Sequence, residues 1–382
     1  MRRLSLVLCG NNPRAAGLLE ALELPEDRIW DMEGGRQSAV PTWLTEGGRQ
    51  SAVPTWLTEG GRQSAVPTGA SEEADCILFV LCADACGPCP EVPALLREIR
   101  CRPGCLAGKL AGVLALGETE TDTKAMARQF FLTADLAGCG FPERPLVEAT
   151  GSLHNLAVTK KREDLPSLEA ALRFAAQGLV RRLLAHRPPR FDRPRLLVLH
   201  ASDRATSNTL RLADMVCSRL DPRFQLSVRS LRNGTIEDCR GCSYKVCSHF
   251  ASKGACFYGG SIAQEVLPAV LECDALLLLL PNYNDAMGAN VMAFINRLTS
   301  LHVSNALTGK RLWALVVSGY SGGDLVAQQA LGALCLNKSL LLPPGFCMME
   351  TANDPGQIKT IPGIQEAAAA FAAHMGREML RE

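Results

Sequence analysis

The segment DALLLLLPNY (274–283) places an uninterrupted apolar run between an aspartate and a Pro-Asn-Tyr turn. Apolar runs without polar alternation are typical of parallel strands that are buried on both faces. Further strand-like segments lie at 195–202, 224–231, 310–319 and 339–346. Stretches with helical spacing separate them, and we expect helices near 207–220, 261–272, 287–301, 323–335 and 362–381. Five strands that alternate with helices predict a doubly wound α/β layer.

The first half of the chain repeats this pattern. DCILFVLCAD (75–84) corresponds to the segment quoted above, and LAGKLAGVLALG (106–117) corresponds to LTGKRLWALVVSG (307–319). Further on, PLVEATGS (145–152) is similar to FCMMETAN (346–353). Because the matching segments occur in the same order at nearly the same spacing, we predict a tandem pair of similar domains.

We place the two domains at residues 1–185 and 195–382. The segment 186–194 between them is rich in proline, which predicts a short, stiff linker. Within the first domain, a 13-residue unit, EGGRQSAVPTWLT, is repeated over residues 33–68. Its Gly-Gly and Pro cannot propagate a helix, so we interpret this stretch as a flexible surface insertion.

Composition and charge exclude several classes of protein. The 382 residues are 47% hydrophobic and 21% charged, which is ordinary for a globular protein. The formal net charge of +1 argues against nucleic acid or an anionic membrane as the main partner. No apolar run reaches the roughly 18 residues of a membrane helix. The chain has 16 cysteines, and no cleavage site follows LSLVLCG (4–10), so we expect a cytoplasmic protein whose thiols serve metal binding, redox chemistry or packing.

Polar residues are concentrated directly after the first strand of the second domain, in HASDRATSNTLRLADM (200–215). They precede a helix whose first N–H groups and dipole attract anions. Helix capping explains one such residue, but five hydroxyl or amide side chains lie within eight positions. We therefore predict a phosphate site here. Its candidate side chains are Ser202, Thr206, Ser207, Asn208 and Thr209.

Two further loops follow strands that should end at the same edge of the sheet. PNYND (281–285) offers an aromatic ring and amide groups, and SGYSGG (318–323) is a glycine-rich turn that allows close approach of a planar ligand. Sheets of this type bind ligands at the carboxyl ends of their strands. We therefore expect all three loops to contribute to one site.

With these loops, residues 195–350 resemble the flavodoxin-like NAD(P)H-dependent FMN reductase family, and in particular its iron–sulfur flavoproteins. The resemblance implies two tandem flavodoxin-like domains, each with a five-stranded parallel sheet of strand order 2-1-3-4-5. It also implies FMN as cofactor, NAD(P)H as electron donor, and a small molecule or a redox protein as acceptor. The flavin carries such chemistry, so no catalytic side chain is assigned. The cofactor-binding residues that the resemblance implies are Ser202, Arg204, Thr206, Ser207, Asn208, Thr209, Pro281, Asn282, Tyr283, Asn284, Asp285, Ser318, Gly319, Tyr320, Gly322 and Gly323.

The segment 239–256 holds four cysteines, with two, four and eight residues between them. Four thiols this close along the chain suit one [4Fe–4S] cluster or one tetrahedral zinc ion. The iron–sulfur flavoproteins have a tighter cysteine motif in this loop, and the difference leaves three interpretations open: a cluster, free thiols or zinc. The candidate ligands are Cys239, Cys242, Cys247 and Cys256.

The first domain lacks the features of the second. Its phosphate-loop counterpart, CGNNPRAAGLLEAL (9–22), has no Ser or Thr, and GETETDTK (117–124) has carboxylates where the second domain has Gly-Gly. We interpret it as a degenerate copy with a packing role, which suggests a monomeric pseudo-dimer or a homodimer. The rival hypothesis for the whole chain is a non-enzymatic zinc-binding or thiol redox sensor on the same fold.

Overall fold

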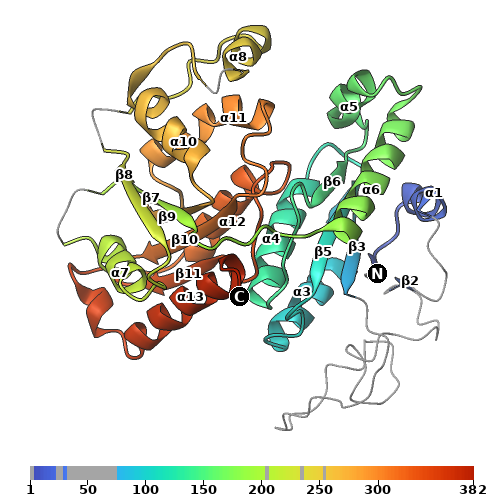
Figure 1. The fold of residues 1–382 in the computed structure, drawn as a ribbon. Coiled ribbons are helices and arrows are strands. Elements are labelled where there is room, and N and C mark those ends of the chain that lie inside the picture. Colours follow the sequence, from blue (N-terminus) through green and yellow to red (C-terminus); the bar gives the residue numbers. More distant parts are fainter. Residues whose placement is uncertain (1–3, 23–28, 32–74, 203–205, 233–235, 253–254) are drawn as a thin grey trace. The chain divides into compact units, whose positions relative to one another are not determined.

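The computed structural model describes residues 4–22, 29–31, 75–202, 206–232, 236–252 and 255–382 (Figure 1). The chain divides into two compact units, Met1–His186 and Arg187–Glu382. The boundary falls at the start of the Pro-rich segment 186–194. The repeats interpreted as an insertion at 33–68 lie outside the described residues.

The second unit contains a parallel sheet of five strands with the order β11-β10-β9-β7-β8. Numbered along the chain, this is the order 2-1-3-4-5 that the resemblance implies. All side chains of β10 and all but the last of β9 are buried, as their apolar runs predict. The strands are β7 (Arg195–His200), β8 (Gln225–Ser230), β9 (Ala275–Pro281), β10 (Arg311–Ser318) and β11 (Cys347–Thr351).

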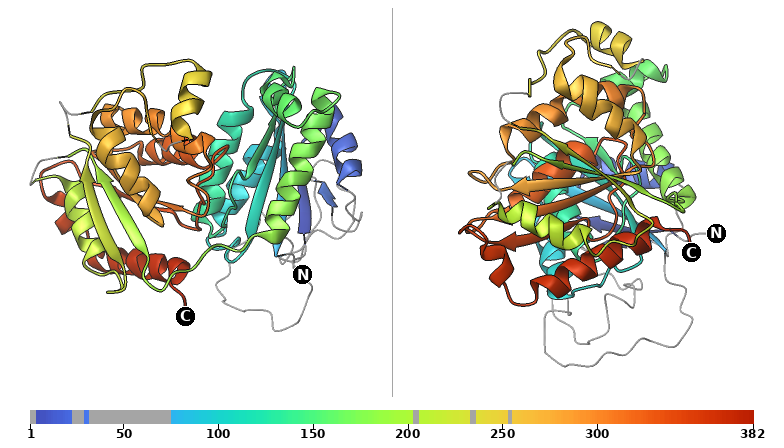
Figure 2. Two further views of the ribbon diagram at one scale, coloured as in Figure 1. Left: turned by 45° about the horizontal axis from the view of Figure 1, so that its top comes forward. Right: turned by 60° about the vertical axis from the view of Figure 1, so that its left-hand side comes forward.

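Helices cover both faces of this sheet (Figure 2). On one face, α7 (Asn208–Cys217) and α13 (Ile364–Met379) pack together over a core that includes Trp313, which is fully buried. On the other face, α12 (Gly323–Leu334) packs on β10 and β11. In the described part of the chain, no helix is both long and apolar enough to cross a bilayer. The remaining helices of this unit are α8 (Tyr244–Ala251), η4 (Ile262–Val266), α9 (Leu267–Glu272), α10 (Ala289–Arg297), α11 (Thr299–Val303) and η5 (Gln357–Thr360).

The prediction of a fifth strand at 339–346 is wrong. Pro343 and Pro344 have no N–H group to donate to a strand ladder, and Gly345 turns the chain with a φ of +58°. Before them, Leu341 forms an isolated bridge with Arg311. The strand itself starts only after this turn, in the segment that the repeat comparison aligned with residues 145–152.

The first unit has a sheet of the same main order, β2-β1-β3-β5-β6, with a short β4 paired antiparallel to β3. Helices α1 and α6 pack on one face of this sheet. Helices α3 and α4 pack against each other. The elements are β1 (Leu4–Cys9), α1 (Pro13–Ala21), β2 (Ile29–Asp31), β3 (Cys76–Asp84), β4 (Gly87–Pro88), α3 (Glu91–Cys101), β5 (Leu110–Gly117), α4 (Thr123–Leu136), β6 (Leu146–Ala149), η3 (His154–Leu156), α5 (Ala157–Arg162) and α6 (Leu168–Ala185).

The Pro-rich segment packs against the second unit. The N–H of Phe191 donates to the carbonyl of Met379 (2.8 Å), and the carbonyl of Phe191 accepts from the N–H of Arg381 (3.0 Å). The guanidinium of Arg311, which is 1% exposed, donates to the carbonyl of Pro189 (2.7 Å). The stretch from Pro189 to Phe191 is therefore part of the folded second unit.

A buried carboxylate in α3 makes the stability of the first unit depend on pH. Glu98 is 3% exposed, and its Oε2 atom lies 3.9 Å from Nε of Arg102, too far for a hydrogen bond. Burial raises the pKa of Glu98 to about 7, although Arg102 and Arg97 oppose the shift. The folded unit thus keeps a proton that the unfolded chain releases from about pH 4.5 upward. The free energy of unfolding should therefore fall as the pH rises toward 7.

We predict that Glu98→Gln raises the free energy of unfolding at pH 8, on the order of 2 kcal/mol, and changes it little at pH 5. The reason is that glutamine is neutral at both pH values. Urea unfolding followed by circular dichroism measures both values, and Glu20→Gln, at an exposed position of α1, is the control. An equal effect of Glu98→Gln at the two pH values would contradict the assignment.

Candidate active site

The loop between β7 and α7 ends in a capped helix start. Ser207 is the N-cap of α7, and its hydroxyl accepts a hydrogen bond from the N–H of Leu210 (3.3 Å). Thr206 is exposed beside it, whereas Thr209 is buried in the first turn. The first N–H groups of a helix have no partner inside it and suit an anion. Ser202 precedes this turn, and Arg204 lies outside the described residues.

Asn208 has a different role from the one predicted. Its Nδ2 donates to the carbonyls of Ala352 (3.0 Å) and Asp354 (2.9 Å), and its Oδ1 accepts from the N–H of Ile358 (3.3 Å). Both amide protons are therefore used inside the protein, and none is left for a phosphate. The side chain ties the start of α7 to the loop after β11, so the prediction of Asn208 as a phosphate ligand is corrected to a bracing role.

A tight turn follows β9. Tyr283 and Ala286 exchange two backbone hydrogen bonds (3.1 Å each), and the residues between them, Asn284 and Asp285, have φ values of 52° and 58°. Positive φ at both central positions is the mark of a type I′ turn, which Asn and Asp tolerate well. The turn leaves the ring of Tyr283 58% exposed. An exposed aromatic ring therefore stands at the carboxyl end of a central strand.

Asn282 joins this turn to the loop after β10. Its Nδ2 donates to Oγ of Ser318 (3.2 Å) and to the carbonyl of Ser321 (2.7 Å). Pro281, the last residue of β9, places Asn282 at this edge of the sheet. The Oδ1 atom of Asn282 is buried and has no hydrogen-bond partner among the described residues. Leaving a buried acceptor without a hydrogen bond costs folding free energy. A ligand that donates an N–H or O–H group to Oδ1 of Asn282 would remove this cost.

The loop from Ser318 to Gly323 passes close to the turn after β9. Gly322, the N-cap of α12, has a φ of +79°, and a Cβ atom there would collide with Oδ1 of Asp285. A Cβ at Gly319 would lie 2.9 Å from Oδ1 of Asn353. These glycines let the loop pack tightly, while the ring of Tyr320 is 81% exposed.

Gln329 is a contributor to this edge that sequence reasoning missed. From α12, its Nε2 donates to the carbonyl of Asp285 (3.0 Å), and its Oε1 accepts from the N–H of Met287 (3.0 Å). The side chain thus holds the turn after β9 in place. No local sequence signal marks it, because a glutamine inside a helix is ordinary.

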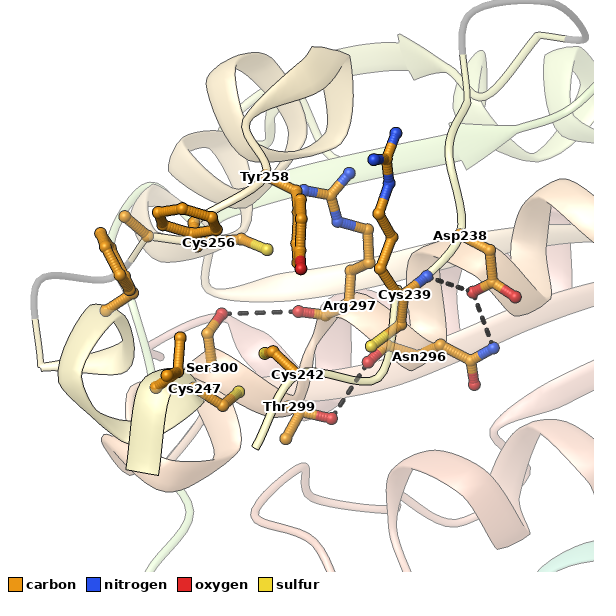
Figure 3. A pocket seen from close by; sticks show the side chains of 15 residues that line it. Asp238, Cys239, Cys242, Cys247, Cys256, Tyr258, Asn296, Arg297, Thr299 and Ser300 are labelled. Atoms are coloured by element: carbon orange, nitrogen blue, oxygen red, sulfur yellow. Dashed lines mark hydrogen bonds between the residues drawn. The ribbon is translucent and has the colours of Figure 1, made fainter. Parts of the chain in front are cut away.

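The four predicted cysteine ligands line one small pocket (Figure 3). Its floor comes from α10 and α11, with Asn296, Arg297, Thr299 and Ser300, and one wall comes from α8, which the sequence did not predict. The cavity of about 30 Å³ has room for about one water molecule. Among the residues that the structure describes, no three His, Cys, Asp or Glu side chains are grouped closely enough to hold a metal ion. In this arrangement the pocket does not fit a [4Fe–4S] cluster.

The first unit is closed at the corresponding edge. The guanidinium of Arg14, in α1, donates to the carbonyls of Gly117 (3.2 Å), Thr150 (3.3 Å) and Gly151 (2.6 Å). Gly10, with a φ of +88°, packs directly against Cys89, so that a Cβ atom there would overlap this side chain. Arg14 and Cys89 thus take up part of this edge with the protein's own groups.

We predict that Gly322→Ala lowers the free energy of unfolding of the second unit more than Gly363→Ala does. Both glycines are helix N-caps with a φ near +75°, but nothing lies within 4 Å of a Cβ at Gly363. Gly363→Ala should cost about 1 kcal/mol of backbone strain. Gly322→Ala should cost about 1–2 kcal/mol more, because Asp285 must move away from Asn282. Urea unfolding followed by circular dichroism compares the two variants, and equal costs would show that the close approach of Gly322 and Asp285 does not affect stability.

The similarity of this chain to known proteins lies in its second unit. Residues 194–354 match the family model for NADPH-dependent FMN reductase. No curated protein matches the chain. Among solved structures, the Trp repressor binding protein from Bacillus subtilis is 17% identical, with 46% of this chain and 94% of that chain covered and a TM-score of 0.31.

Two further solved structures have a similar sequence identity, coverage and TM-score. The WrbA-like flavodoxin from Agrobacterium tumefaciens is 14% identical, with 48% of this chain and 99% of that chain covered and a TM-score of 0.33. An FMN-dependent NADH-azoreductase from Bacillus anthracis, solved with FMN, is 12% identical, with 47% and 99% covered and a TM-score of 0.32. On the strength of the match over residues 194–354, the second unit is that of a flavin-dependent NAD(P)H oxidoreductase.

Proposed function

We propose that the second unit binds FMN at the carboxyl edge of its sheet and uses it to oxidise NAD(P)H. The observation that carries this proposal is that three polar loops follow the strands β7, β9 and β10 at the carboxyl edge of the sheet, with the strand order changing direction between β7 and β9. The family match over residues 194–354 covers all three loops. The electron acceptor in this proposal is a small molecule or a redox protein.

The residues at this edge have features that suit FMN. The start of α7, with Thr206 and Ser207, offers hydroxyl and N–H groups for the phosphate. Pro281–Asp285 and Ser318–Gly323 offer exposed rings and close backbone for the two sides of the isoalloxazine. Asn282 offers a buried acceptor that still needs a donor. Bound FMN supplies the hydride chemistry, while these residues bind and orient it.

For the first unit we propose a packing role without a flavin, as a degenerate copy of the second. The support is the shared strand order together with the closure of its ligand edge by Arg14 and Cys89. We also propose a cytoplasmic protein that is a monomer with two similar units or a homodimer.

The pocket of four thiols supports a second candidate function, a thiol redox sensor without enzymatic activity. A zinc ion or an iron–sulfur cluster at these thiols stays a prediction, because the described residues are not grouped closely enough to hold a metal ion, and no electron-transfer step is assigned to these thiols. Anaerobic purification with FMN, iron and zinc assayed per chain separates the alternatives. About one FMN per chain supports the reductase, whereas zinc without flavin supports the sensor.

We predict that Thr206→Glu weakens FMN binding at least about tenfold, because a carboxylate would repel the phosphate. Binding of riboflavin, which has no phosphate, should change much less. Quenching of flavin fluorescence measures both affinities. The control is Asn11→Glu, at the exposed matching loop of the first unit, which should leave both affinities unchanged. If the substitution weakened the binding of FMN and of riboflavin equally, the phosphate of FMN would not bind at the start of α7.

A further inference from the structure

Two of the four pocket thiols flank the first turn of α8. Cys242 precedes Ser243, the N-cap of α8, and Cys247 lies in the first turn, where its N–H donates to the carbonyl of Ser243 (2.9 Å). Burial raises the pKa of the Cys247 thiol, and the charge and hydrogen bond of Cys242 add to the shift. Cys242 stands just before the N-cap and Cys247 at the fourth position of the helix, and side chains at these two positions commonly pack together. These positions single out one pair among the four thiols.

The floor of the pocket is held by interactions that do not involve this pair. Oδ1 of Asp238 accepts from the N–H of Cys239 (2.6 Å) and from Nδ2 of Asn296 (2.9 Å). Arg297, which is 4% exposed, donates to the carbonyl of Glu237 (3.4 Å). Figure 3 shows this anchored side of the pocket, with Asp238 bonded to Asn296 at the end of α10. The floor is therefore anchored independently of Cys242 and Cys247.

The pair is also reachable from solvent. Cys242 and Cys247 are both partly exposed, whereas Cys273, Cys335 and Cys347 of the same unit are buried. Exposed apolar side chains stand among the residues that line the pocket: Val246 is 39% exposed, Phe257 58% and Tyr258 39%. A small organic molecule has apolar surface to contact beside the two sulfur atoms.

We propose that Cys242 and Cys247 form a thiol–disulfide exchange site for small disulfides. The thiolate of one cysteine attacks the disulfide R–S–S–R, forms a mixed disulfide with one half and releases the other half as a thiol. The second cysteine then attacks the mixed disulfide, and the second R–SH leaves. The cysteine pair loses two electrons and two protons, and the small disulfide gains both, so the exchange is balanced.

The chain offers a direct readout of this pairing. Trypsin cuts after Arg240, Lys245 and Lys253, so Cys239, Cys242, Cys247 and Cys256 fall into four different peptides. The reduced full chain is incubated with oxidised glutathione, quenched with iodoacetamide, digested and analysed by mass spectrometry. The expected product joins residues 241–245 to residues 246–253, with a loss of two free thiols per chain and release of two molecules of glutathione.

Variants separate this pair from other cysteines. Cys242→Ser should abolish the joined peptide and trap glutathione on Cys247, whereas Cys217→Ser, at a partly exposed cysteine on α7, should leave the joined peptide unchanged. Circular dichroism checks that each variant folds.

Three results would overturn the proposal. In the first, Cys242 and Cys247 are each found alkylated after treatment with oxidised glutathione. In the second, a different pair of cysteines is joined preferentially. In the third, the purified chain retains iron or zinc at these thiols. The assay is independent of the proposed function, because flavin binding is measured separately by fluorescence.

Discussion

Burial of the central strands on both faces is the constraint on which the site depends. All side chains of β10 and nearly all of β9 are withdrawn from solvent, so a polar group placed inside these strands is costly. The polar residues of the site therefore stand where the strands end. Ser318, the last residue of β10, marks this limit: it is 2% exposed, and its hydroxyl accepts from Asn282. From there outward the chain can carry amides, hydroxyls and exposed rings.

The two units show how little has to change at such an edge to close it. Both sheets have the same main strand order and a matching isolated bridge, Leu110 with Gly140 and Arg311 with Leu341. In each unit, a side chain from the first helix ties that helix to the loop after the last strand. The second unit uses Asn208 for this, whereas the first uses the longer Arg14.

Apolar runs were enough to predict most of the second sheet, because a strand buried on both faces has few other ways to satisfy its side chains. The strand order came from the family resemblance. Periodicity failed at 339–346, where the apolar run continues through Pro343 and Pro344, although these residues cannot join a ladder. The loops of the candidate site could be predicted because their residues stand at strand ends. The roles of Asn208 and Gln329 depend on partners far away in the sequence, which no local pattern reveals.

The packing of Pro189 and Phe191 sets the smallest fragment that contains a complete second unit. The family match begins at residue 194, and a chain cut there would lose both residues. The guanidinium of Arg311 would stay buried without the carbonyl that it now binds, and the end of α13 would lose its backbone partners. The folded second unit therefore begins several residues before the family match does. It begins in the proline-rich segment that the sequence predicts to be a linker.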